Sequence, residues 1–169
     1  MAIHLRCYKV TEKSHLPEYG TEDSACFDLK ASLEDVESVS VFGITNSKTQ
    51  RVVEDNSVLL YAGERILVPT GIIFDLSTGQ SLRIHPRSGL AWKCGINLAN
   101  CEGVVDADYI DPTFVMLHNN SDMPFKISDG DRIAQAEVHI NFLRFNFDVI
   151  TEKPVLKTDR EGGFGSTGV

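Results

Sequence analysis

Short runs in which apolar and polar residues alternate recur along the chain, separated by turn residues. Near the start, for example, Ile3, Leu5 and Cys7 alternate with His4, Arg6 and Tyr8. A period of two is typical of a strand with one buried face. On this basis strands are predicted at residues 3–10, 58–61, 65–69, 71–76, 81–85, 113–118, 132–140 and 142–150. The pattern favours an all-β sandwich or barrel.

Two segments depart from this pattern. Residues 90–94 are predicted to form one short helix, with Ser88 capping its start and Gly95 ending it in a left-handed conformation. Residues 34–57 are more polar and contain a turn-like stretch at residues 45–48. We expect them to form an extra surface hairpin between core strands.

Composition narrows the function classes. A chain of 169 residues that is 42% hydrophobic can bury one core, so one domain is expected. A formal net charge of −8 argues against binding of long nucleic acids, which depends on clustered Lys and Arg. Any anionic ligand should therefore be small and locally neutralised. With no apolar run that could span a bilayer, we expect no membrane partner and a cytoplasmic location, or the host cytoplasm for a viral protein.

Residues 86–91 combine Arg87, Ser88 and Gly89 at the start of the predicted helix. Free backbone N–H groups and the helix dipole favour an anion such as phosphate there. The alternative interpretation is a plain serine cap, and Arg87 shifts the balance toward an anion site.

Residues 100–109 run through a predicted hairpin that ends in carboxylates and an aromatic ring. A carboxylate such as Asp106 can position and deprotonate a water, and Asn100 can present a donor and an acceptor to a base edge. A hairpin with merely acidic turn residues is the alternative.

Two polar side chains interrupt apolar strands elsewhere. Asp28 should be paired or hydrogen-bonded if it is buried. Gln135 on its own is typical of an ordinary solvent-facing strand residue.

Residues 160–168 close the sequence with an arginine, a phenylalanine and four glycines. Glycines let backbone N–H groups approach an anion, Arg160 can contact phosphate oxygens, and Phe164 can stack on a base. A flexible polar tail is the alternative interpretation.

Taken together and in this order, these segments resemble the five motifs of the homotrimeric dUTP pyrophosphatases (dUTPases), over residues 25–168. The motifs read PRSGLA, GxxDxDY and, at the terminus, RxGGFGSTG. The resemblance implies a jelly-roll β-barrel over residues 1–158, with 34–57 as an inserted surface hairpin. It also implies a trimer with active sites at subunit interfaces and a flexible arm, residues 159–169, closing over a neighbour's site.

By the same resemblance, the chain hydrolyses dUTP to dUMP and pyrophosphate, which limits uracil incorporation into DNA and supplies dUMP for thymidylate synthesis. Asp106 would activate the water that attacks the α-phosphorus, with Arg87 and Asp28 assisting. Mg²⁺ would be held mainly by the phosphates, and Asp28 would reach it through water. The residues assigned to uracil and deoxyribose are Asn100, Gly103, Val105, Tyr109 and Phe164, and those assigned to phosphate are Arg87, Ser88, Gly89, Gln135, Arg160, Gly163, Gly165, Ser166 and Thr167.

The sequence differs from the usual dUTPase pattern at two places, and two other functions compete with this interpretation. Cys26 stands where the family usually has glycine, and Ile110-Asp111-Pro112 replaces the usual continuation after the tyrosine. A dCTP deaminase has the same fold family, but Met116 stands where its catalytic glutamate is expected. A non-catalytic nucleotide sensor with the same pocket is the second rival.

Overall fold

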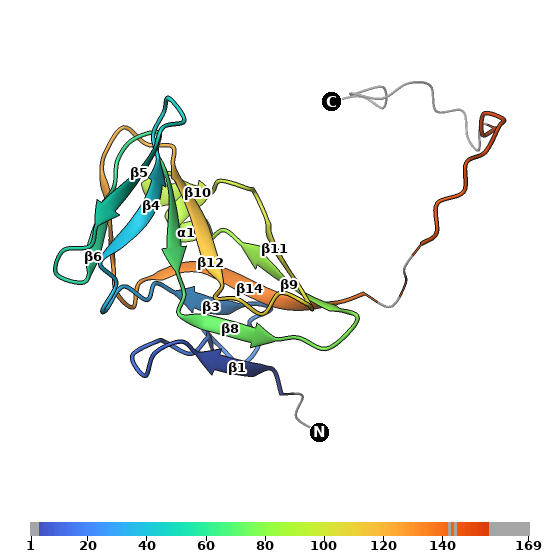
Figure 1. Cartoon of the computed structure of the whole chain (residues 1–169), viewed down its shortest axis with the longest axis horizontal. Coiled ribbons are helices and arrows are strands. Elements are labelled where there is room, and N and C mark those ends of the chain that lie inside the picture. The colour runs from blue at the N-terminus through green and yellow to red at the C-terminus, as the bar shows by residue number, and fades with distance from the viewer. Residues whose placement is uncertain (1–3, 142, 144, 156–169) are drawn as a thin grey trace.

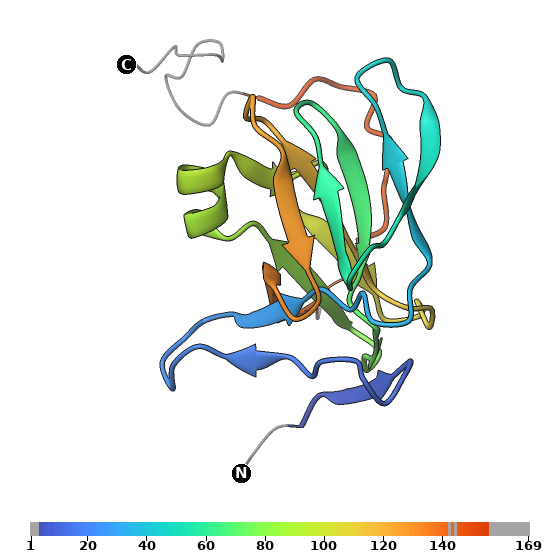
Figure 2. The ribbon, with the colours of Figure 1, turned by 90° about the vertical axis from the view of Figure 1, so that its left-hand side faces the viewer.

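Antiparallel strands are the main regular structure of the fold, in agreement with the predicted all-β class. The computed structural model describes residues 4–141, 143 and 145–155. Two five-stranded sheets and two two-stranded pairs surround one hydrophobic core (Figure 1). One short helix, α1 (Ser88–Cys94), stands beside the strands (Figure 2).

Fourteen strands are found in the described residues and are numbered in chain order. The strands are β1 (Arg6–Lys9), β2 (Glu18–Tyr19), β3 (Phe27–Lys30), β4 (Ser38–Phe42), β5 (Lys48–Val52), β6 (Ser57–Leu60), β7 (Arg65–Pro69), β8 (Ile72–Asp75), β9 (Gln80–His85), β10 (Ile96–Leu98), β11 (Gly103–Asp106), β12 (Phe114–Asn119), β13 (Phe125–Ser128) and β14 (Arg132–Ile140).

The sheet orders show how distant segments meet. One sheet has the order β11-β9-β14-β3-β2 and the other β10-β12-β7-β4-β5, while β1 pairs with β8 and β13 with β6. Within the described residues both large sheets keep free edges, so the sandwich does not close into a barrel. β11 is one of these edge strands, which matters for the site below.

Alternation along the strands builds the core. Leu29, Ile66, Leu82 and Leu117 come from both large sheets, and each is at most 1% exposed. Each such side chain contributes about 1.5–3 kcal/mol on burial, so the apolar positions of the period-two pattern stabilise the sandwich.

The strand predictions succeed where the alternation is long and a partner strand exists. Residues 65–69 and 132–140 are strands with the predicted bounds. The strand expected at 142–150 is wrong for the residues described there, since 143 and 145–150 lie in no strand. No strand among residues 4–141 pairs with them.

The hairpin expected within residues 34–57 is present as β4 and β5. β4 also pairs with β7, so the hairpin widens a core sheet. Arg51 of β5 forms a salt bridge to Glu64, in the turn before β7, which holds the hairpin against the body. Its status as an insertion stays a prediction.

The ends of α1 agree with the prediction only in part. Gly95 ends the helix with φ 68°, as expected for a left-handed cap. The N-cap is Arg87, whose backbone is extended and whose side chain makes no capping bond, so the predicted Ser88 cap is wrong. Ser88 is instead the first helical residue.

Across the part of the chain that the structure describes, no helix has the length and apolar character needed to cross a bilayer.

Candidate active site

The predicted site residues outside the arm lie on or next to the sheet β11-β9-β14-β3-β2. Asp28, Asp106 and Gln135 are strand residues on its face turned away from the core, here called the outer face. Asp28 of β3 lies opposite Gln135 of β14, and Gln135 lies opposite His85 of β9. Residues directly opposite on antiparallel strands point to the same face. The register therefore places three polar side chains in one row across the sheet.

Asp28 is held between two arginines. Its Oδ1 lies 2.9 Å from Arg87 Nε and its Oδ2 lies 3.2 Å from Arg132 Nη1, and its side chain is only 12% exposed. The expectation that a buried Asp28 would be paired is confirmed. Because Asp28 is largely buried, its carboxylate would be costly to leave without any cationic partner, and two arginines guard against that.

Gln135 and Arg87 are fixed to the backbone as well. Gln135 Nε2 donates to the carbonyl of Pro86 at 3.1 Å, and Arg87 Nη1 donates to the carbonyl of Arg132 at 3.3 Å. Gln135 therefore does more than face solvent. Asp28, Arg87, Arg132 and Gln135 are called the cationic corner from here on.

Gly89 lies beside this corner in the first turn of α1. A Cβ built on Gly89 would meet no other atom within 4 Å. Neither packing nor a left-handed backbone requires glycine at this position, so the space beside it stays open for a ligand.

The predicted uracil residues lie on β11 and on the turn that links β10 to it. β10 pairs with β12 and β11 with β9, so the hairpin expected at residues 100–109 is wrong, and this turn connects the two large sheets. β11 is an edge strand. The backbone groups on its edge away from β9 therefore have no partner strand among the described residues. The Val105 side chain is buried in the core, which leaves only its backbone for a ligand. A Cβ on Gly103 would lie 3.1 Å from Ile84 Cβ, so here the glycine serves packing.

Asn100 occupies the turn between these strands and is exposed. Cys101 follows with φ 63°, and the Glu102 amide donates to the Asn100 carbonyl at 2.7 Å. Glu102 also contacts Arg83 of β9 at 3.2 Å. The turn is thus tied to the sheet and presents the Asn100 side chain to solvent.

Asp106 ends β11 with an exposed side chain, and its carbonyl accepts the Tyr109 amide at 3.1 Å. The Tyr109 hydroxyl donates to the Pro112 carbonyl at 3.1 Å, so the unusual Ile110-Asp111-Pro112 segment restrains the ring. Asp106 and Asp108 line a pocket of about 470 Å³ whose other walls include Ser81 and Asn141. Asp106, Asp108 and Tyr109 are called the acidic corner.

The two corners do not meet within one chain. Asp106 lies opposite Ser81 at one end of β9, whereas the Asp28 row passes through His85 at the other end. Four residues along the strand and three strand spacings across the sheet give a separation of about 20 Å. Within one chain, the predicted site residues outside the arm therefore form two separate groups.

The other departure, Cys26, directly precedes β3 and is half-buried. Burial raises the pKa of its thiol, and the charge of Glu137 raises it further. The side chain is therefore a neutral thiol near neutral pH.

Metal binding has no ready-made cage among the described residues, since no three His, Cys, Asp or Glu side chains there gather around one point. The predicted arm residues Arg160, Gly163, Phe164, Gly165, Ser166 and Thr167 lie outside the described residues.

Comparison with known proteins accounts for this combination of residues. The dUTPase family model matches residues 51–168. A deoxyuridine 5'-triphosphate nucleotidohydrolase from Bartonella bacilliformis is 35% identical over 179 aligned positions, which cover 99% of this chain and 90% of that one. The chain belongs to the dUTPase family.

Solved structures agree on the fold of this dUTPase-family chain. The dUTPase of Staphylococcus bacteriophage 80alpha with dUPNHPP has a TM-score of 0.76 at 17% identity, covering 99% of this chain and 100% of that one. A mutant dUTPase of phage phi11 of S. aureus, described with a structural Mg(II) ion, has a TM-score of 0.67 at 16% identity, covering 89% and 98%. The predicted jelly-roll class of the dUTPases is confirmed.

Sequence reasoning missed Arg132, although it lies in the same turn-and-strand motif as Gln135. Gln135 points to the outer face. If successive residues of β14 pointed alternately to the two faces of the sheet, residue 133 would also point outward and residue 132 would point into the core. A bulge between Arg132 and Ala134 reverses this. Only the paired strand reveals such a bulge.

Proposed function

We propose that the protein is an enzyme that hydrolyses dUTP to dUMP and pyrophosphate. The observation that carries this proposal is the ion-paired cationic corner, where Asp28, Arg87 and Gln135, far apart in the sequence, meet beside the open space at Gly89. Family membership supports the choice of dUTP. The reaction would keep uracil out of DNA and supply dUMP for thymidylate synthesis.

The cationic corner would bind the triphosphate. Arg87 uses its Nε for Asp28 and one Nη for the Arg132 carbonyl, which leaves its other amino group for a phosphate oxygen. Ser88, Gly89 and Gln135 would supply further hydrogen bonds. Because phosphoryl-type displacement depends on positioning and charge neutralisation, a prefixed arginine is well suited to it.

The edge of β11 would select uracil. Its free backbone groups, together with Asn100, offer a fixed pattern of donors and acceptors, and Tyr109 would pack under the deoxyribose. Cytosine would reverse one donor and one acceptor, which costs about 1–3 kcal/mol for each buried group left unpaired.

Asp106 would act as the general base. Its exposed carboxylate at the end of β11 lines the pocket, where it can hold a water for in-line attack on the α-phosphorus. The pyrophosphate then leaves from the side held by the arginines.

Mg²⁺ would supply further charge neutralisation when bound. Oxygen donors are the ligands that it prefers, but both Asp28 oxygens already contact arginines. We therefore assign the metal mainly to the three phosphates, with Asp28 reaching it through water.

A homotrimer would bring the corners together, because the acidic corner of one copy can face the cationic corner of the next. A second observation favours partner chains. Leu143, Phe145, Phe147 and Val149 alternate along a segment that extends away from the sheets, and they are 74–96% exposed (Figure 1). Such a stripe needs a covering surface, and a neighbouring copy can provide one.

The arm would complete the site. Arg160 would reach the phosphates, Phe164 would cover the uracil, and Gly163, Gly165, Ser166 and Thr167 would wrap the phosphate chain. Ending the chain after Thr158 should leave a folded trimer that hydrolyses dUTP poorly. Full activity of that truncated chain would contradict the role of the arm.

The deaminase alternative is less well supported. Met116 lies on β12, in the sheet that does not contain Asp106, and it carries no group that could transfer a proton. A sensor without catalysis would not need Asp106 beside the pocket.

One incubation separates the three possibilities. The protein is supplied with dUTP or dCTP and Mg²⁺ in ¹⁸O-labelled water. We expect pyrophosphate and dUMP in equal amounts from dUTP, with the label in dUMP. Label in pyrophosphate would contradict attack at the α-phosphorus, ammonia from dCTP would indicate a deaminase, and saturable binding without products would indicate a sensor.

A further inference from the structure

Arg132 is the residue of the cationic corner to which neither the motif assignments nor the comparisons give a role. It begins β14 directly after the Gly130-Asp131 turn. Its guanidinium contacts Asp28, while its backbone carbonyl accepts Arg87 Nη1. Arg132 therefore reaches Arg87 by two routes, one through the Asp28 carboxylate and one through its own backbone.

The β-bulge explains why Arg132 points to this corner. Ala134 lies opposite Leu29, and Arg132 lies opposite Lys30, so Ile133 is the extra residue. Ile133 and Ala134 are both buried, at 2% and 0% exposure. Without the extra residue, Arg132 would point into the core. Bulges often re-aim a side chain beside an active site in this way.

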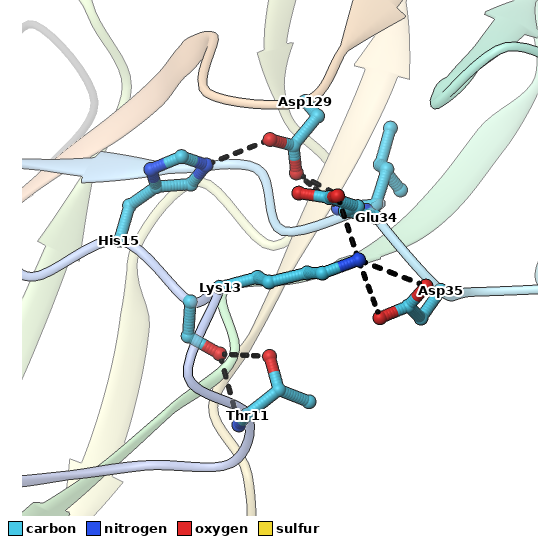
Figure 3. Close-up of polar contacts among 8 residues, drawn as sticks. Thr11, Lys13, His15, Glu34, Asp35 and Asp129 are labelled. Atoms are coloured by element: carbon cyan, nitrogen blue, oxygen red, sulfur yellow. Dashed lines mark hydrogen bonds and ion pairs between the residues drawn. The ribbon is translucent and has the colours of Figure 1, made fainter.

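The turn that precedes Arg132 is held in place at Asp129, whose contacts with His15 and with the backbone at Glu34 are drawn in Figure 3. Asp129 Oδ1 accepts the Leu33 amide at 2.7 Å, and its Oδ2 lies 2.8 Å from His15 Nε2. The following residues, Gly130 and Asp131, exchange backbone hydrogen bonds with Ala31 at 2.9 and 2.8 Å. The carbonyl that Arg87 contacts thus belongs to a firmly tied turn.

We propose that Arg132 is a positioning residue for dUTP hydrolysis, which holds the Asp28 carboxylate and thereby fixes the Arg87 guanidinium with one amino group free for phosphate. This inference rests on the proposed function. With a single arginine on Asp28, the carboxylate can rotate and Arg87 loses its fixed orientation. Misplacing a group that stabilises the transition state by about 1 Å can cost up to 10²-fold in rate.

The test compares wild type with Arg132→Gln, Arg132→Lys, Asp28→Asn and the double variant Asp28→Asn/Arg132→Gln. We expect Arg132→Gln to lower kcat by about tenfold or more with a smaller change in KM, and Arg132→Lys to recover part of the loss. In the Asp28→Asn background, Arg132→Gln should add little, because its target is already gone. Lys30→Gln is the matched control, since Lys30 lies opposite Arg132 but pairs with Glu18, and it should keep wild-type kcat.

Several outcomes would overturn this role. Wild-type kcat in Arg132→Gln would contradict the positioning role. Losses of kcat that multiply in the double variant would contradict it too, because they would indicate that Arg132 contacts phosphate directly. The Arg132 side chain is 53% exposed, so the urea midpoint of Arg132→Gln should stay unchanged, and an unfolded variant would mean a merely structural role. Absence of pyrophosphate release by the wild type would instead reject the proposed function itself.

Discussion

The cationic and acidic corners of the outer face differ in how much of their geometry one chain supplies. The cationic corner is internally complete, since Asp28, Arg87, Arg132 and Gln135 bind one another or the backbone. At the acidic corner Asp106 is exposed, and its hydrogen bond to Tyr109 comes from the backbone carbonyl rather than from the carboxylate. The groups to which we assign phosphate binding are thus held in place by the chain itself, whereas the carboxylate to which we assign the attacking water stays exposed. Four predictions test this contrast.

The largest effect is expected at the acidic corner. Asp106→Asn should lower kcat by about 10²–10⁴-fold, because a carboxamide cannot accept the proton of the attacking water. Affinity for a non-hydrolysable dUTP analogue should change only a few-fold, since the arginines stay in place. Steady-state kinetics and calorimetric titration measure the two quantities. Asp108→Asn, in the same pocket, is the control. An equal loss of kcat in Asp108→Asn would contradict a specific role of Asp106 as the general base.

Mixing two inactive variants tests whether the corners come from different copies. Asp106→Asn and Arg87→Ala chains are unfolded together at equal amounts and refolded. If each site takes its corners from two chains, about one quarter of the sites in randomly mixed trimers is intact, so activity reappears. Each variant refolded alone is the control. No recovery, despite mixed trimers seen by native mass spectrometry, would place both corners of a site on one chain.

The two glycines give a smaller, matched contrast. Gly103→Ala should lower the free energy of unfolding by about 1–3 kcal/mol, because its Cβ would crowd Ile84. Gly89→Ala should not destabilise the fold, since its Cβ meets nothing, but it should raise KM for dUTP by entering the phosphate space. Urea unfolding and kinetics of both variants provide the comparison. Equal loss of stability in both would contradict the open space at Gly89.

The smallest effect concerns the anchor of the cationic corner in acid. Burial works to raise the pKa of the Asp129 carboxyl, but the Leu33 amide, His15 and the Glu34 amide together hold it below its ordinary value. A lowered folded-state pKa stabilises the fold above the unfolded value of about 3.9, and this contribution is lost as the pH falls through the folded pKa.

Asp129→Asn should therefore cost about 1–2 kcal/mol in free energy of unfolding at pH 7, with the difference from wild type shrinking below about pH 4. Urea unfolding between pH 7 and 3 measures this. Asp131→Asn is the neighbouring control. Among the described contacts, the Asp131 carboxylate accepts one hydrogen bond, from the Ser128 amide. A difference that grows in acid would contradict the anchor.

The sequence alone was enough to predict the all-β architecture, several of its strands and the family. Period-two burial predicted β7 and β14, and the ordered motifs predicted the family, Asp28, Arg87 and Gln135. These predictions depend on local side-chain properties and on order along the chain, which one sequence displays directly.

Only the tertiary structure decided which of these groups meet. The bulge that turns Arg132 toward Asp28, the cap at Arg87 in place of Ser88, and the separation of Asp106 from Arg87 across the sheet depend on pairing between strands distant in the sequence. A shift of one residue in that pairing moves a side chain to the opposite face. Residues 143–149 show the same dependence. Their sequence alternates like that of a strand, but a strand forms only where a second backbone accepts and donates its hydrogen bonds.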